Sequence, residues 1–97
     1  MPDRFEILFR PEVESDLRPI GRLHQRRILS ALEERLAAHP VKYGKPLGGQ
    51  LGGLRRIRVG DFRIAYQVKG LQVIVWAVLH RKEIYAELAR RFTSPKA

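Results

Sequence analysis

Residues 54–80 read LRRIRVGDFRIAYQVKGLQVIVWAVLH, and this stretch decides the fold. Apolar side chains recur at the two-residue period of a β-strand, and turn residues interrupt the pattern at Gly60-Asp61 and at Gly70. Short glycine-containing breaks between such runs are typical of β-hairpins. The stretch therefore predicts three consecutive antiparallel strands, over Leu54–Val59, Phe62–Lys69 and Gln72–His80.

A two-residue turn at Gly60-Asp61 determines which side chains of the first hairpin share a face. It places Val59 opposite Phe62 and Arg58 opposite Arg63. Because side chains alternate along a strand, one face is apolar and the other is basic. The predicted core face carries Ile57, Val59, Phe62, Ile64, Tyr66 and Val68. The predicted opposite face carries Arg56, Arg58, Arg63, Ala65 and Gln67.

The basic face holds three arginines, Arg56, Arg58 and Arg63, and no acid. Directly opposed like charges destabilise a sheet, so folding alone does not favour Arg58 opposite Arg63. Mixed charges would serve solubility equally well, although any single arginine could be an ordinary solvated charge. Guanidinium groups offer paired donors that match phosphate oxygens. The trio therefore predicts a face that binds a phosphodiester backbone.

The rest of the chain predicts one α+β domain. Alternation from Phe5 to Phe9 predicts an opening strand, and helical spacing predicts a short helix over Pro11–Ile20 and a longer one over Leu23–Ala38. Glycines from Val41 to Leu54 predict a loop, and Arg81–Phe92 can form a last helix. The domain is expected to span residues 1–92, in the order β-α-α-β-β-β-(α), with a disordered tail over 93–97.

Composition narrows the classes of partner. The 97 residues include 19 Lys and Arg against 10 Asp and Glu, a net charge of +9 that is concentrated between Lys42 and Lys82. Such a balance indicates a polyanionic partner: nucleic acid, an anionic membrane surface or an acidic protein. The chain has no Cys, which excludes disulfides, thiolate metal sites and cysteine nucleophiles. No apolar run suggests a signal peptide or membrane span, so we expect a cytoplasmic location and no membrane partner.

Two stretches resemble a known family. Lys45–Val68, reading KPLGGQLGGLRRIRVGDFRIAYQV, and Val78–Tyr85, reading VLHRKEIY, resemble the RelE/ParE superfamily of bacterial toxins, and RelE-type mRNA endoribonucleases in particular. The resemblance implies a four-stranded, mainly antiparallel sheet with two helices packed on one face. It also implies ribosome-dependent cleavage of mRNA, in which a 2′-OH attacks the adjacent phosphate to leave a 2′,3′-cyclic phosphate, without a metal or other cofactor.

The resemblance further implies the roles of particular residues. The expected catalytic set is Arg56, Arg58, Arg63, Arg81, His80 and Tyr85, and the expected RNA contacts are Lys45, Arg55 and Lys82. Arginines would stabilise the charge that develops on the phosphate, Arg63 foremost. Because arginine stays protonated, another group must act as base, and both His80 and Tyr85 are candidates. Tyr66 and Trp76 fall at alternating core positions, so we expect them to pack rather than to stack on bases.

Two other functions stay open at this point. The superfamily also contains ParE-like toxins that inhibit DNA gyrase without enzymatic activity, and a fold does not by itself set a function. The basic face could also belong to a nucleic-acid-binding module that performs no chemistry. In the toxin interpretations the expected partner is a RelB-like antitoxin, whose acidic, partly disordered segment would cover the basic protein.

Overall fold

The structure is a computed structural model and describes residues 4–93. Its elements in chain order are β1 (Glu6–Phe9), α1 (Glu12–Leu17), α2 (Arg22–Ala31), the π-helical turn η1 (Leu32–Leu36), α3 (Pro40–Tyr43), β2 (Lys45–Pro46), the 3₁₀ turn η2 (Gly49–Leu51), β3 (Arg55–Val59), β4 (Phe62–Lys69), β5 (Gln72–His80) and α4 (Ile84–Thr93).

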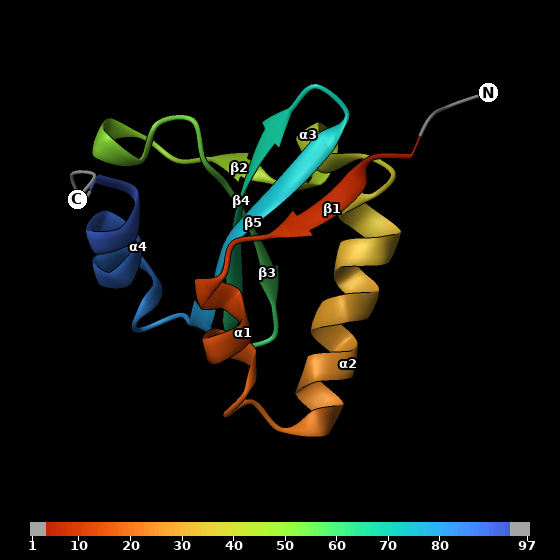
Figure 1. The fold of residues 1–97 in the computed structure, drawn as a ribbon, viewed down its shortest axis with the longest axis vertical. Helices are drawn as coiled ribbons and strands as arrows, with labels where there is room; N and C mark the ends of the chain where they lie inside the picture. The colour runs from red at the N-terminus through yellow and green to blue at the C-terminus, as the bar shows by residue number, and fades with distance from the viewer. Residues whose placement is uncertain (1–3, 94–97) are drawn as a thin grey trace.

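The five strands form one sheet in the order β1-β5-β4-β3-β2 (Figure 1). β1 runs parallel to β5, and the other neighbouring pairs are antiparallel. Gly60 and Gly70 adopt positive φ in the two meander turns, a conformation that suits glycine. The predicted α+β architecture and meander are confirmed. The predicted count of four strands is one too low, because the two-residue β2 is too short to show a period.

The predicted apolar face of the hairpin forms the main core. Ile57, Ile64 and Tyr66 are buried there, and Val59, Phe62 and Val68 pack partly buried beside them. The helices α1 and α2 and the turn η1 cover this face, with Val13, Ile28, Ala31, Leu32 and Leu36 as their buried contributions. The two predicted helices therefore pack on one face of the sheet, as expected.

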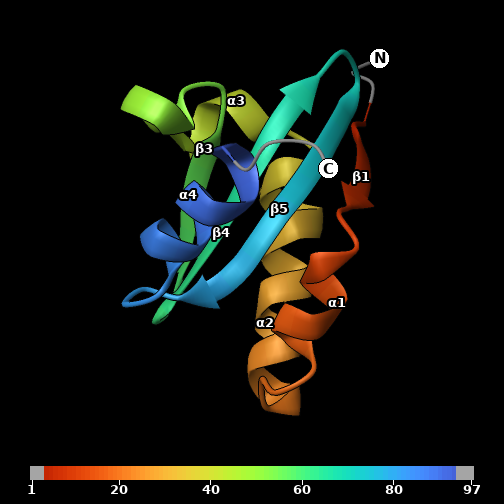
Figure 2. The same ribbon diagram turned by 60° about the vertical axis from the view of Figure 1, so that its left-hand side comes forward.

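The opposite face carries a second, smaller core beneath α4. Buried Ile84 and Leu88 of α4 pack with Ala65 and Ala77 of the sheet and with Leu54. Figure 2 shows α4 on the side of the sheet away from α2. Because Ala65 and Ala77 have small side chains, α4 packs directly on this face of the sheet, beside the arginines.

The segment between α2 and β3 is more ordered than its predicted loop. Tyr66 donates its hydroxyl hydrogen to the Pro40 carbonyl. Arg55 Nη2 donates to the carbonyls of Val41 and Gly44, both at a distance of 2.8 Å. Gly44 is buried against Tyr66 so closely that a Cβ would overlap the tyrosine hydroxyl. Burial raises the pKa of Tyr66, although the neighbouring Arg55 acts in the opposite direction.

The predicted tail falls mostly outside the described residues. Thr93, its first residue, belongs to α4, and residues 94–97 lie beyond the described range. No helix within residues 4–93 has the length and apolar character required to cross a membrane.

Candidate active site

Strand register gathers four cationic side chains on the sheet face that carries α4. Lys45 of β2 lies opposite Arg56 of β3, which in turn lies opposite Ala65 of β4. Two residues further along β3, Arg58 lies opposite Arg63. Residues directly opposite each other share a face, so the predicted register and the predicted basic face are both present. We call Lys45, Arg56, Arg58 and Arg63 the cationic face.

Tyr85 reaches this face from the first turn of α4. Arg56 Nη1 donates a hydrogen bond to the hydroxyl oxygen of Tyr85, which is 42% exposed. Since the oxygen accepts from Arg56, the tyrosine's own hydrogen is free to point elsewhere. The structure therefore joins Tyr85 to Arg56 of the cationic face and leaves the residue partly exposed.

Arg63 and Arg81 lie around the turn between β3 and β4. Arg63 Nη1 donates to the carbonyls of Gly60 and Phe62, at 3.0 and 3.1 Å. Arg81 lies beside Asp61, with 3.6 Å between Nε and a carboxylate oxygen, and its backbone N–H donates to the Asp61 carbonyl. Both sides of the Arg81–Asp61 pair are more than half exposed, so the aspartate screens Arg81 only weakly.

His80 lies on the other face of the sheet. The register of β5 against β4 shifts between Ala65 and Tyr66, so Trp76 is an extra residue in β5 and the alternation reverses after it. As a result His80 lies opposite Phe62, a core-face residue, and their rings are 6.2 Å apart in an edge-on contact. The structure does not bring His80 together with the cationic face.

The three expected RNA contacts have different surroundings. Lys45 is exposed on the cationic face. Lys82 is exposed in the turn after β5, where its backbone N–H donates to His80 Nδ1 over 3.2 Å. Arg55, by contrast, is turned toward α3, where its guanidinium donates to two carbonyls. Arg55 therefore has a structural role, since its hydrogen bonds hold the connection between α3 and β2 in place.

The charge of the cationic face is not neutralised by neighbouring acids. Among the ion pairs within residues 4–93, none includes Lys45, Arg56, Arg58 or Arg63. The same part of the chain contains no group of three or more His, Asp or Glu side chains that could hold a metal ion. This face thus presents four cations beside the phenolic hydroxyl of Tyr85.

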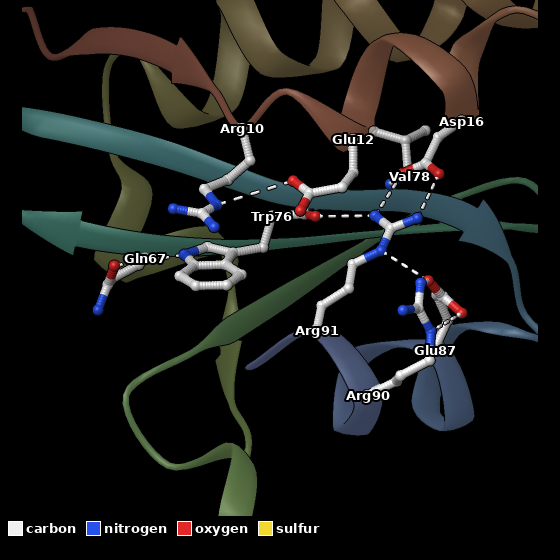
Figure 3. Close-up of polar contacts among 9 residues, drawn as sticks. All are labelled: Arg10, Glu12, Asp16, Gln67, Trp76, Val78, Glu87, Arg90 and Arg91. Carbon is white, nitrogen blue, oxygen red and sulfur yellow. Dashed lines mark hydrogen bonds and ion pairs between the residues drawn. The ribbon is translucent and has the colours of Figure 1, made fainter. Parts of the chain in front are cut away.

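A buried ion pair, missed by the sequence analysis, holds the far end of α4. Arg91, with an 8% exposed side chain, donates from both terminal nitrogens to the Asp16 carboxylate, at 2.7 and 2.8 Å (Figure 3). Asp16 also accepts from the N–H of Val78, and Arg91 donates to the carbonyl of Trp76. These bonds satisfy backbone groups on the edge of β5 beyond the end of β1. The hydrogen bond with Asp16 also raises the pKa of Arg91.

Two further side chains line the cationic face without having been predicted. Arg35 of η1 and Tyr43 of α3 border a cavity at the outer edge of β3, together with Lys45, Arg56, Ile57 and Arg58. Neither residue belongs to the stretches that carried the resemblance. Only the path of the chain through α3 and β2 brings them there.

Comparisons with known proteins agree with this architecture. The model of the ParE toxin of type II toxin-antitoxin systems matches residues 7–85. A chain of the RelB-RelE antitoxin-toxin complex from Methanococcus jannaschii is 32% identical, with a TM-score of 0.67, over 82% of this chain and 96% of that one. A chain of the RelBE2 toxin-antitoxin complex from Mycobacterium tuberculosis is 24% identical, with a TM-score of 0.76, over 80% and 99%.

More distant structures share the fold alone. A YafQ mutant from E. coli is 16% identical, with a TM-score of 0.60, over 84% of this chain and 99% of that one. The search of curated proteins gave no match. Because the family model spans the sheet, the cationic face and Tyr85, the chain belongs to the ParE toxin family of type II toxin-antitoxin systems, within the RelE/ParE superfamily.

Proposed function

We propose that this protein is a toxin of a type II toxin-antitoxin system that cleaves mRNA on the ribosome, in the cytoplasm, as a metal-independent endoribonuclease. The observation that carries the proposal is the hydrogen bond between Arg56 and Tyr85 on a face whose cations have no acidic partner within residues 4–93. A face that only bound phosphate would need the cations but not the phenolic hydroxyl.

The reaction forms one phosphorus–oxygen bond, breaks another and transfers two protons. The 2′-oxygen of a ribose attacks the adjacent phosphorus, the bond from phosphorus to the 5′-oxygen breaks, and the products carry a 2′,3′-cyclic phosphate and a 5′-OH. The 2′-OH loses its proton to solvent water, and the 5′-oxygen gains one from a donor that solvent then reprotonates. Between these states the phosphorus is pentacoordinate and doubly negative, so preorganised cations lower the barrier most effectively there.

The cationic face supplies that stabilisation. Arg58 and Arg63 lie directly opposite each other and can both donate to the oxygens of one phosphate. Removing one preorganised donor of this kind costs about 10²- to 10³-fold in rate. Arg81, at the rim near Asp61, can contact a neighbouring phosphate.

Tyr85 is the proposed proton-transfer group. Its oxygen accepts from Arg56, so its own hydrogen can be donated to the departing 5′-oxygen. His80 is the other candidate from the sequence, but it lies beside Phe62 on the face covered by α1 and α2. Tyr85 is therefore our choice over His80.

The proposed partner is a RelB-like antitoxin. Structures similar to this chain include those of RelB-RelE complexes from Methanococcus jannaschii and Pyrococcus horikoshii. A net charge of +9 favours an acidic partner segment through long-range attraction. Binding of such a segment over the cationic face should weaken as salt is raised.

Inhibition of DNA gyrase is the second candidate, and the match to the ParE toxin model is what favours it. That activity needs no proton-transfer group, so the Arg56–Tyr85 contact would have no part in it.

Two assays on the purified toxin separate these functions. In the first, the toxin is added to translating ribosomes and the 5′ ends of the mRNA are mapped. In the second, gyrase supercoiling is followed at the same concentrations. We expect new mRNA ends and unchanged supercoiling. Intact message together with inhibited supercoiling would reverse the assignment.

A further inference from the structure

An exposed aromatic side chain stands next to the cationic face. Tyr43 is 47% exposed and lines the cavity of about 250 Å³ at the outer edge of β3. The other lining residues are Arg35, Lys45, Arg56, Ile57 and Arg58, which include four cations and no acid. We propose, on the basis of the proposed function, that this cavity is a subsite for one nucleotide of single-stranded RNA, with its phosphate among the cations and its base stacked on Tyr43.

Single-stranded nucleic acid is bound by cations combined with an exposed aromatic ring, and the Tyr43 ring is half exposed, with Lys42 Nζ 5.8 Å from its centroid. Cations bind the backbone, and every base has a face that can stack on an aromatic ring. Trp76 and Tyr66 cannot serve in this way, because Tyr66 is fully buried and Trp76 packs against Phe92. Tyr43 supplies a second exposed aromatic ring beside the cations, in addition to Tyr85 of the catalytic set.

Tyr43 is exposed but its backbone is held in place. Buried Tyr66 donates to the Pro40 carbonyl, and Arg55 donates to the carbonyls of Val41 and Gly44 on either side of Tyr43. The ring is thus presented from a fixed turn of helix, so little conformational freedom is lost when a base binds. Exposure alone does not indicate binding, since Phe9 is equally exposed; what distinguishes Tyr43 is its place in a cavity lined by four cations.

Arg35 also lines the cavity. Its Nη1 donates to the carbonyl of Arg58 over 3.2 Å, on the edge of β3 beyond the short strand β2. The guanidinium has further donors that can reach a phosphate in the cavity. The cavity is somewhat smaller than the ~300 Å³ typical of sites that enclose a drug-sized ligand, so it fits a phosphate group and leaves the base outside against Tyr43.

The subsite adjoins the proposed cleavage site through Arg56. This residue lines the cavity and also donates to Tyr85. A single strand lying across β3 would therefore place one phosphate near Tyr85 and the next nucleotide toward Tyr43. The inference adds Tyr43 and Arg35 to the residues that position the RNA.

The test measures binding without cleavage. The probe is a fluorescently labelled hexa-adenylate with 2′-O-methyl riboses, which lacks the attacking hydroxyl, and fluorescence anisotropy at about 50 mM salt gives its Kd for the full chain. Tyr43→Leu should weaken binding about 5- to 100-fold, the range expected for one lost stacking contact. Tyr43→Phe, which keeps the ring, should stay within about twofold of the wild type.

Two controls make the result specific. Phe9→Leu removes an aromatic ring that is also 47% exposed but lies on β1, at the other edge of the sheet, and should leave the Kd unchanged. On the same oligomer without bases, Tyr43→Leu should bind as the wild type does. The proposal is overturned if Tyr43→Leu binds hexa-adenylate normally, if it loses the baseless oligomer equally, if Phe9→Leu weakens binding to a similar extent, or if the wild type does not bind.

The RNA subsite and the nuclease function can be refuted independently. Tyr43-dependent binding combined with intact mRNA on ribosomes contradicts the nuclease function and keeps the subsite. Cleavage of ribosome-bound mRNA combined with normal RNA binding by Tyr43→Leu contradicts the subsite and keeps the nuclease.

Discussion

Arg56 connects the parts of the cationic face. It has Lys45 opposite it on one side and Ala65 on the other, and it donates to Tyr85 from below α4. The small side chain of Ala65 leaves room for α4 to lie close to the sheet. The contact between Tyr85 and Arg56 therefore depends on the long side chain of Arg56 lying next to the short side chain of Ala65.

The phenolic hydroxyl is the group to test first. Tyr85→Phe should lower the rate of a single round of mRNA cleavage by about 10²- to 10⁴-fold, because it removes a proton-transfer group and keeps the ring. The thermal midpoint should change little, since the side chain is 42% exposed. Quantitative primer extension on ribosome-bound mRNA measures the rate.

His80→Gln provides the matched control for that variant. His80 lies opposite Phe62 on the face away from the arginines, so its replacement should change the cleavage rate by less than about fivefold, far below the general acid-base range. A loss equal to that of Tyr85→Phe would mean that His80 reaches the substrate and that our choice of proton-transfer group is wrong.

At the scale of elements, α4 depends on the ion pair that ties it to α1. Arg91 and Asp16 have side chains only 8% and 4% exposed, and each also bonds to the backbone of β5. Arg10 lies over the indole of Trp76, 4.2 Å from its centroid, beside the same helix end (Figure 3). Removing Arg91 leaves Asp16 buried without a charge partner, and removing Asp16 leaves the buried Arg91 with only the part-exposed Glu87 as its ion-pair partner.

Asp16→Ala should therefore lower the free energy of unfolding by about 3–5 kcal/mol, as measured in urea. The double variant Asp16→Leu, Arg91→Met should lose less than the single variant, because no unpaired charge remains. Arg18→Ala is the control, since its 3.5 Å pair with Glu14 is exposed and should cost at most about 1 kcal/mol. Equal losses of unfolding free energy for Asp16→Ala and Arg18→Ala would show that the buried ion pair contributes no more to stability than the exposed one.

The same helix should respond to acid. Hydrogen bonds from Arg90, and secondarily from Arg91, lower the pKa of Glu87 to about 2 from 4.5. A carboxyl whose pKa is depressed in the folded state adds stability above its unfolded pKa, and that stability is lost as pH falls from about 4.5 toward 2. Glu87→Gln should thus flatten the fall of unfolding free energy across this range.

Thermal unfolding at several pH values measures that slope. Glu83→Gln serves as control, because Glu83 is an exposed carboxylate just before α4 and lies outside the Arg90–Glu87–Arg91 group. A wild type and a Glu87→Gln variant with identical slopes between pH 4.5 and 2 would contradict the assigned pKa.

The strands whose apolar residues alternate over their whole length could be predicted from the sequence, whereas a local irregularity in a strand and a long-range ion pair could not. Alternation from Ile57 to Val68 identified both faces of the hairpin. One extra residue at Trp76 then reversed the alternation in β5, and this moved His80 to the core side. Nothing in the local pattern marks Arg91 as buried, because its partner Asp16 is 75 residues away in the chain. Pairing over such distance comes from the packing of α1 against β5.

For the whole molecule, the central feature is uneven charge. The net charge of +9 arises mainly between Lys42 and Lys82, which includes β2, β3 and the cationic face. The acids that form ion pairs are mostly on α1, η1 and α4. The protein thus presents one strongly cationic side, and under the proposed function a nucleic acid and an acidic antitoxin segment would compete for its cations.

The most direct test of the central claim is the chemistry of the mRNA ends made on translating ribosomes by the wild type and by the folded variant Arg56→Gln, Arg58→Gln, Arg63→Gln. The account predicts wild-type fragments that begin with a 5′-OH and end in a 2′,3′-cyclic phosphate, and no fragments from the triple variant. Message left intact by the wild type, or cleaved equally by the triple variant, would contradict it.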